Sequence, residues 1–181
     1  LTSFTSDGFD MNVGTYGSMN GDDDKFITWG WKAGGVPSGT LSIDSDGFGA
    51  GTIANTGNAT VISASVNQAG GFSITKFYGH SSGCTIPHNL GDTPEFFLVK
   101  SLTNSGASDG WFAWHKDMGT LTQRHLFLNT NADLITQTDV FTSVPNSTSI
   151  TTGTSNGTGG GPYTFIYYAW KAVAEVSHFG T

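Results

Sequence analysis

The stretch that decides the fold is Phe165-Ile166-Tyr167-Tyr168-Ala169-Trp170-Lys171-Ala172. It is rich in aromatic and β-branched residues and lacks helical spacing, which indicates a β-strand. The same pattern occurs in Phe26-Ile27-Thr28-Trp29-Gly30-Trp31-Lys32-Ala33, at an offset of 165 − 26 = 139 residues. In both places an Asn-Gly loop precedes the strand, and a further short run precedes the loop. We therefore predict an internal strand–loop–strand duplication.

Successive side chains of a strand point to opposite faces, so each copy offers two candidate core faces. One face of each copy is assigned to the core: Ile27, Trp29 and Trp31 in the first copy, and Ile166, Tyr168 and Trp170 in the second. The opposite faces are mixed, and we expect them to be partly covered: Phe26, Thr28, Gly30 and Lys32, and Phe165, Tyr167, Ala169 and Lys171.

Short alternating runs bounded by Gly, Asn, Asp and Pro recur through the rest of the chain, and long helical periodicity is missing. The clearest predicted strands are 25–32, 72–78, 95–100, 110–116, 125–129 and 163–171. The sequence therefore predicts an all-β, antiparallel fold. Its predicted organisation is the closing part of one repeat (1–35), a Gly/Ser/Thr/Asn-rich connecting segment (36–68) and a main repeat (69–181), together forming a piece of a longer repetitive protein.

Composition excludes several classes of protein. The 181 residues carry a formal charge of −7, which argues against nucleic-acid binding because phosphate recognition needs a basic surface. Only 12% of residues are charged, against about 25% in ordinary soluble domains, so the polar surface consists of hydroxyl and amide groups. One cysteine, Cys84, allows neither an intrachain disulfide nor a multi-thiolate metal site. We expect no membrane insertion, because no run of 18 apolar residues occurs.

A family resemblance rests on five segments, one of which begins with the turn Ile86-Pro87-His88-Asn89-Leu90-Gly91-Asp92-Thr93-Pro94. The segments are 69–74, 86–100, 111–116, 126–129 and 163–180. Together they resemble a repeat of virion structural proteins from tailed bacteriophages, marine cyanobacterial phages in particular. At Asn89 that repeat more often has Gly, and Asn also tolerates the positive φ of such a turn.

The resemblance implies a β-sandwich of jelly-roll or concanavalin-A-like type. It also implies a location on the virion surface or outside the cell, in a fibre, an appendage or a capsid decoration. The expected partners are copies of the chain or other virion proteins, and bacterial surface glycans. The resemblance transfers no catalytic residues.

Two sets of residues are candidate metal ligands. The first set consists of carboxylates concentrated in loops: Asp22, Asp23, Asp24, Asp44 and Asp46. These residues either bind a calcium ion or form solvated acidic turns. His80, Cys84 and His88 are spaced four apart, as zinc ligands on one helix face would be. Gly83 and Pro87 oppose a helix there, and we expect a strand–turn–strand with solvent-facing histidines instead.

Aromatic side chains beside polar loops give a candidate sugar-binding platform, because sugars stack their apolar faces on aromatic rings. The candidates are Trp111, Trp114, His115 and Tyr167. The alternative for each of these residues is a place in the core, since strand aromatics are commonly buried.

Enzymatic function finds little support. The two glutamates, Glu95 and Glu175, have no acidic residue two positions away, so the paired carboxylates of a glycoside hydrolase are missing from the pattern. A nucleophile elbow and a phosphate-binding loop are also missing. We expect a non-enzymatic virion module, with a lectin-like carbohydrate-binding domain as the alternative and a polysaccharide depolymerase ranked third.

Overall fold

The computed structural model describes residues 3–5, 9–10, 28, 30–31, 59–104, 110–118 and 123–179. The chain forms two units, Leu1–Trp31 and Lys32–Thr181. In the first unit, strands β1 (Ser3–Phe4) and β2 (Phe9–Asp10) pair in antiparallel register. The Ser3 hydroxyl donates a hydrogen bond of 2.7 Å to the Asp10 carboxylate across this pair.

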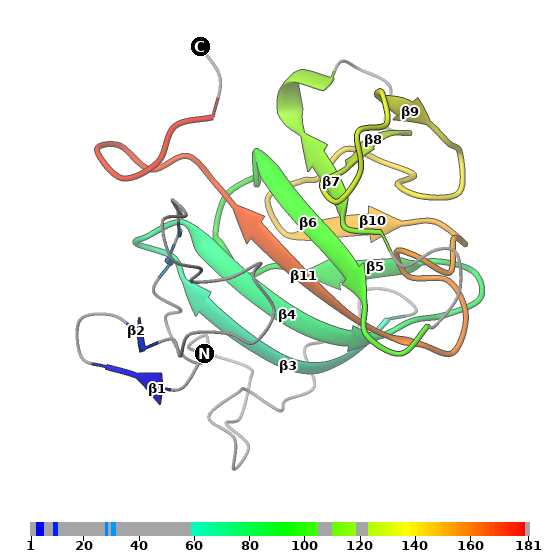
Figure 1. Ribbon diagram of the computed structural model, residues 1–181, viewed down its shortest axis with the longest axis horizontal. Coiled ribbons are helices and arrows are strands. Elements are labelled where there is room, and N and C mark those ends of the chain that lie inside the picture. Colours follow the sequence, from blue (N-terminus) through cyan, green and yellow to red (C-terminus); the bar gives the residue numbers. More distant parts are fainter. Residues whose placement is uncertain are drawn as a thin grey trace, which may run out of the picture. The chain divides into compact units, whose positions relative to one another are not determined.

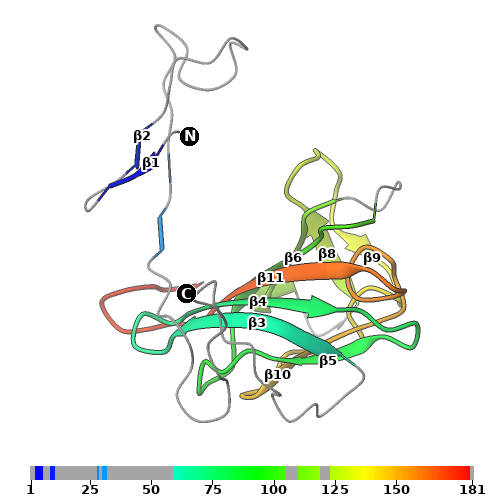
Figure 2. The same ribbon diagram turned by 90° about the horizontal axis from the view of Figure 1, so that it is seen from below.

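The second unit is an antiparallel β-sandwich, which confirms the predicted fold class (Figure 1). Its large sheet has the order β3-β4-β11-β6-β7-β8-β9. Those strands are β3 (Thr60–Asn67), β4 (Phe72–Tyr78), β11 (Thr164–Trp170), β6 (Phe96–Ser101), β7 (Phe112–His115), β8 (Arg124–Phe127) and β9 (Ile135–Thr136). The small sheet pairs β5 (Cys84–Pro87) with β10 (Ser149–Thr152), and Figure 2 shows it against one face of the large sheet. A 3-10 turn, η1 (Lys116–Met118), follows β7.

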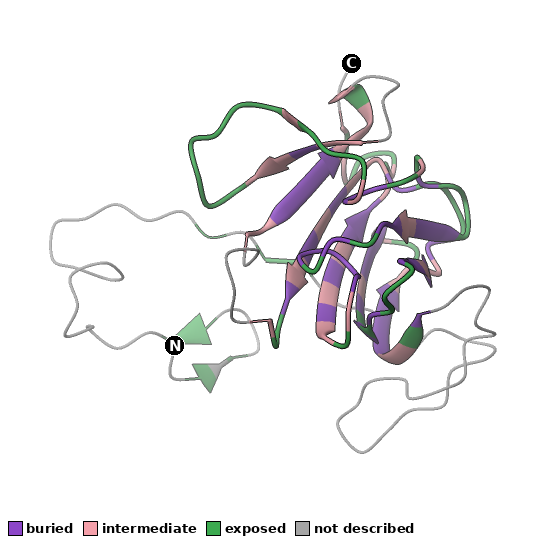
Figure 3. Ribbon diagram, turned by 90° about the vertical axis from the view of Figure 1, so that its right-hand side faces the viewer, coloured by how far each residue is buried: buried purple, intermediate pink, exposed green. Residues whose placement is uncertain are grey.

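The hydrophobic core fills the space between the two sheets. Phe77, Phe97 and Phe165 project into it from the large sheet, and Ile86 and Ile150 project from the small one. All five are at most 1% exposed. Burial of each such side chain stabilises the fold by about 1.5–3 kcal/mol, so this aromatic layer holds the sheets together. The buried strand segments are purple in Figure 3.

The expected core face of the 163–171 strand is wrong. Phe165, Tyr167 and Ala169 are fully buried between the sheets. Ile166 and Tyr168 lie half-buried on the opposite, outer face of the large sheet. Trp170 also belongs to that outer side by alternation and is buried there, where its ring packs against Phe72 and Phe96 with centroids 5.0 and 5.2 Å away. Both faces of β11 are therefore apolar, and the period-two pattern alone does not distinguish the inner face from the outer one.

The strand predictions are confirmed where alternation is longest. β4 has the predicted bounds 72–78, and β6, β7, β8 and β11 lie within two residues of theirs. The clearest predicted strands did not include β3, which lies in the expected connecting segment 36–68, nor β5, β9 and β10. Thr28, Gly30 and Trp31 are not in a strand, contrary to prediction, and Trp31 is 51% exposed rather than in the core. The other residues of the first copy, Ile27 and Trp29 included, lie outside the described residues.

Two further features follow from the sequence. Asn89 has φ 56°, as expected for the turn after β5. Within the described part of the chain, no helix has the length and apolar character needed to cross a membrane.

Candidate functional site

The candidate site is a cleft where the end of β11, the start of β6 and the end of β7 lie side by side. Backbone hydrogen bonds fix this alignment: the Glu95 amide donates to the Trp170 carbonyl at 2.8 Å, and the Lys116 amide donates to the Glu95 carbonyl at 2.9 Å. The cleft has a volume of about 690 Å³, which lies in the range of small-molecule sites. Of the lining residues only Trp114 lies within a strand, and the others belong to turns and loops beside the strand ends.

The floor of the cleft is apolar. Pro94, Trp114 and Pro145 line it and are buried, and Val144 stands at the rim with 49% of its surface exposed. The indole of Trp114 is fixed from behind by the stacked ring of Phe97, with centroids 5.2 Å apart. The floor is therefore a preformed apolar surface.

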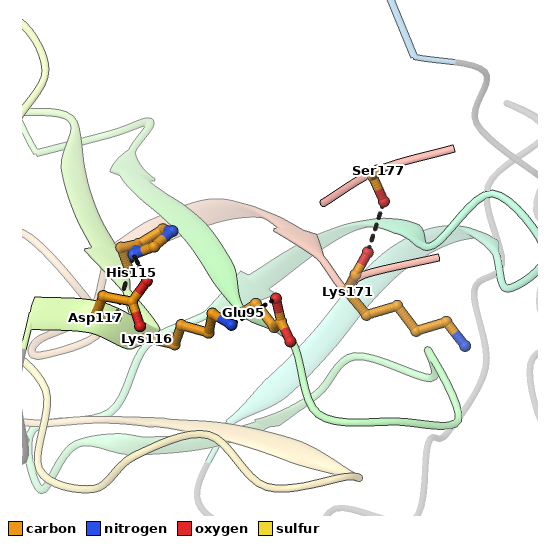
Figure 4. Close-up of polar contacts among 6 residues, drawn as sticks. All are labelled: Glu95, His115, Lys116, Asp117, Lys171 and Ser177. Atoms are coloured by element: carbon orange, nitrogen blue, oxygen red, sulfur yellow. Dashed lines mark hydrogen bonds and ion pairs between the residues drawn. The ribbon is translucent and has the colours of Figure 1, made fainter. Parts of the chain in front are cut away.

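The rim of the cleft carries charges of both signs (Figure 4). The Lys116 ammonium lies 3.4 Å from the Glu95 carboxylate, and both side chains are partly exposed. Asp117 is exposed, with its carboxylate 3.7 Å from Nδ1 of His115. Because surface ion pairs contribute at most about 1 kcal/mol, these groups can exchange their partners for a ligand at low cost.

Lys171 and Asp92 complete the rim. In Figure 4 the Lys171 side chain extends away from Glu95, and its ammonium forms no ion pair with the described residues. Its backbone carbonyl accepts a hydrogen bond of 3.0 Å from the Ser177 hydroxyl, which holds this segment in place. Asp92 accepts a hydrogen bond of 2.7 Å from the Thr93 amide. An apolar floor under a rim of carboxylates and ammonium groups suits a ligand with apolar ring faces and polar edges.

The predicted sugar platform does not exist as one surface. Tyr167 is fully buried and Trp114 is only 4% exposed, so neither presents a ring face to a ligand. Burial strongly raises the pKa of Tyr167, whose hydroxyl is used inside the protein. It donates to the Pro87 carbonyl at 2.5 Å and accepts from the Thr75 hydroxyl at 2.9 Å. For Tyr167 and Trp114 the core alternative is the correct one.

Trp111 and His115 lie half-buried on the outer face of the large sheet, away from the core. The Trp111 ring lies 6.0 Å from that of Tyr168. His115 contacts Phe96 and Phe179, at 6.3 and 6.4 Å between ring centroids. The structure thus brings Trp114 and the neighbours of His115 to the cleft, while Trp111 belongs to a different surface.

The structure describes only one of the two sets of candidate metal ligands. Asp22, Asp23, Asp24, Asp44 and Asp46 lie outside the described residues. Among the described residues, no cluster of three or more metal-ligating side chains occurs. Cys84 and Ile86 face the core in β5, so the helix needed for the zinc spacing is not formed there.

The expectation of solvent-facing histidines is wrong for His88, which is fully buried, whereas His80 is exposed. Nδ1 of His88 accepts a hydrogen bond from the Leu90 amide at 3.2 Å. The proton therefore resides on Nε2 of His88, which donates to the Asn146 carbonyl at 2.9 Å. Burial is the main cause that lowers the pKa of His88. The neutral ring therefore joins two loops and is already satisfied as a structural group.

The comparisons with known proteins place the chain in a family. A family model described as a domain of unknown function, DUF7483, matches residues 1–181. The chain belongs to this family. No curated protein and no solved structure matches it.

Sequence reasoning missed the rim residues Asp92, Lys116, Asp117 and Lys171. Of these, Asp92 lies close to Glu95 in sequence, and that proximity was an available signal for a charged site. Lys116 and Lys171 reach the same cleft only because β11 lies beside β6, which in turn lies beside β7.

Proposed function

We propose that this domain is a non-enzymatic module of a phage virion surface, in a fibre, an appendage or a capsid decoration, and that it assembles with copies of itself. The resemblance of its turn and strand segments to virion structural repeats supports the setting. One structural observation supports assembly: the outer face of the large sheet is apolar across its central strands.

The outer face is defined here by the outward residues of β4, β11 and β6, together with Leu102. Register places Ile74, Tyr168 and Leu98 in one row, and Phe72, Trp170 and Phe96 in the next. The only charged side chains among the outward residues of these three strands are Lys76 and Lys100. At one end of the face Tyr78 is 43% exposed, and Leu102 is 49% exposed. Phe72 and Trp170 are already buried within the chain, so this face offers a partner its half-buried apolar side chains and, beyond Lys76 and Lys100, the exposed Tyr78 and Leu102. Exposed apolar groups that gather on one face mark interaction sites.

Sedimentation velocity of the full chain over a wide range of protein concentration tests assembly. We expect self-association that strengthens with concentration. The double variant Tyr78→Ser with Leu102→Ser removes the two most exposed apolar groups of the face and should shift the protein toward the monomer. Because both side chains are exposed, the variant should fold normally, and far-UV circular dichroism checks this.

Leu134→Ser is the matched control, because Leu134 is also 43% exposed but precedes the edge strand β9. It should leave self-association unchanged. A wild-type chain that stays monomeric at every concentration contradicts assembly through this face. Assembly through this face is also contradicted if Leu134→Ser weakens self-association as much as the double variant does.

A second candidate function is attachment to a bacterial surface glycan through the cleft. The supporting observation is a cleft in which the apolar Val144 stands beside rim groups of both charges, Lys116, Lys171, Asp92 and Asp117. A glycan array with the wild type and with Lys171→Ala and Asp117→Ala tests it, and loss of the same glycan in both variants is expected. Trp114→Ala is unsuitable for this test, because it removes a core side chain. A wild type that binds no glycan on the array contradicts this function.

A further inference from the structure

A second hollow lies on the opposite layer of the sandwich, on the outer side of the β5–β10 sheet. Its volume is about 430 Å³. Cys84, Ile86, Ile150 and Thr152 of this sheet are buried, so the alternating residues Thr85 and Thr151 point outward. They are directly opposite each other in the register.

A third segment extends this row of threonines. Phe141 forms a bridge with Thr152, and the Thr142 amide donates to the Thr151 carbonyl at 3.4 Å. Thr142 therefore lies beside Thr151 on the same outer side as Thr85. Further hydroxyls surround the row. Besides the buried Thr152, the hydroxyl lining comprises six residues: Ser82, Thr85, Thr138, Thr142, Thr151 and Thr154.

The shape of the hollow depends on Gly153. A Cβ at this position would lie 2.3 Å from the Asp139 carbonyl oxygen, so only glycine allows the 138–142 segment to approach β10 this closely. Two backbone hydrogen bonds of 2.8 Å hold the approach, from Gly153 to Val140 and from Ser155 to Asp139. The half-buried Asp139 is thereby fixed at the wall of the hollow.

The polar side chains of the hollow form few interactions inside the domain, and the electrostatic effect of the Asp139 carboxylate on His125 is one of them. None of the six lining hydroxyls, nor the Asp139 carboxylate, hydrogen-bonds through its side chain to any residue that the structure describes. Threonines elsewhere in the domain do use theirs, since Thr75 donates to Tyr167 and Thr158 donates to the Val140 carbonyl. The hollow therefore presents side-chain hydroxyls without a protein partner to a molecule that enters it.

The chemistry of these groups selects the ligand. An apolar ligand would displace water from the hydroxyls without replacing the hydrogen bonds that the water makes, and this loss is costly in free energy. An anion would meet the Asp139 carboxylate and no positive side chain in the lining. A neutral polyhydroxylated molecule can donate to the carboxylate and exchange hydrogen bonds in both directions with the threonines.

We propose that the threonine-lined hollow formed by β5, β10 and the 138–142 segment is a binding site for a neutral saccharide, separate from the charged cleft. The proposal does not depend on assembly through the outer face.

Titration of the ¹⁵N-labelled full chain, followed by amide chemical shifts, tests the site. The probes are glucose, galactose, mannose, rhamnose and N-acetylglucosamine, with glucuronate and calcium chloride as charged comparisons. At least one neutral probe should cause saturable shifts at Thr85, Thr142 and Thr151. Thr151→Val keeps the side-chain shape, and Asp139→Asn keeps its size. Each should weaken binding about tenfold or more, because a hydrogen bond to the ligand is lost.

Thr136→Val is the matched control, since Thr136 is an exposed strand threonine in β9 outside the hollow. This control and the cleft variant Lys171→Ala should bind the neutral probe as the wild type does. The proposal is overturned if no neutral probe causes saturable shifts in the hollow, if only calcium does so, or if the control weakens binding as much as Thr151→Val. Loss of binding in Lys171→Ala alone would assign the sugar to the cleft and also overturn it.

Discussion

The phenol oxygen of Tyr167 lies 2.5 Å from the backbone carbonyl oxygen of Pro87, a residue 80 positions earlier in the chain. Tyr167 belongs to β11, an interior strand of the large sheet, and Pro87 ends a strand of the small one. This hydrogen bond therefore joins the two layers of the sandwich inside its core, and the Thr75 hydroxyl donates to the same phenol oxygen.

Tyr167→Phe should destabilise the domain, because the buried Pro87 carbonyl and the Thr75 hydroxyl both lose their partner. The expected loss is about 2 kcal/mol in the free energy of unfolding. Urea denaturation measures it. Tyr78→Phe is the control, since Tyr78 is 43% exposed and should change stability little. Equal effects of the two substitutions would show that the interlayer bond contributes nothing.

Trp114→Ala and Trp111→Ala should differ strongly, although the two residues are three apart. Trp114 is 4% exposed and contacts Phe97 in the core, so its truncation should cost about 3–5 kcal/mol. Trp111 is half-buried on the outer face, and its truncation should cost clearly less. Thermal unfolding of both variants makes the comparison. A larger loss for Trp111→Ala would contradict the assignment of faces.

Acidification should destabilise the domain through His88 and His125. Burial is the main cause that lowers the pKa of each below its ordinary value of 6.5. Between the folded and unfolded pKa values the unfolded chain binds more protons, so the stability contributed by the neutral rings is complete above about pH 6.5 and declines as the pH falls below it. Urea denaturation at a series of pH values from 7.5 downward measures the slope. A stability that stays flat or rises on acidification across this range would contradict the prediction.

His125→Leu should separate this pH effect from structural damage. The His125 ring is fully buried among Phe112, Phe127 and Phe141, and neither of its nitrogens has a hydrogen-bond partner. Replacing it with an apolar residue of similar size should leave stability at pH 7.5 within about 1 kcal/mol and reduce the pH slope. His88→Leu should be clearly destabilising, because it removes the partners of Leu90 and Asn146. If His125→Leu is the more harmful of the two, the apolar description of its site is wrong.

Gly153→Ala should destabilise the domain, since the added methyl group would meet the backbone of Asp139. A cost of about 1–3 kcal/mol is typical of such overpacking. Gly70→Ala is the comparison, because the atoms it would meet belong to the Asn67 side chain rather than to the backbone. Chemical denaturation should give the larger loss for Gly153→Ala, and the reverse order would contradict the close packing of the 138–142 segment.

Period-two alternation was sufficient to locate β4 and most of β11, because each has strong strand formers on both faces. The same property concealed which face is inside. Ile166, Tyr168 and Trp170 are bulkier than Phe165, Tyr167 and Ala169, yet the second set is buried. The inner face contains a tyrosine because Pro87 offers its hydroxyl a partner, and no local pattern could reveal a contact across 80 residues.

The short strands β5 and β10 were not among the clearest predicted strands, although β10 lies at the run before the Asn-Gly loop of the second strand–loop–strand copy and β5 lies in the strand–turn–strand expected around His80 to His88. Each has four residues, and each carries an outward threonine between buried neighbours, so it resembles the polar loops around it. The threonine hollow depends on these two strands, and the charged cleft depends on the position of β11 beside β6. Both sites are consequences of strand order, which alternation does not encode.

The interior place of β11 also has a consequence for biogenesis. Residues 164–170 pair on one side with 72–78 and on the other with 96–101, so an interior position of the large sheet is filled by the last of its strands to leave the ribosome. Until then β4 and β6 lack their shared neighbour, and both carry unpaired backbone groups and large apolar side chains. Such long-range pairing slows folding and lengthens the time during which nascent chains can aggregate. The rate at which translation delivers these seven residues therefore influences how much of the protein reaches its native state.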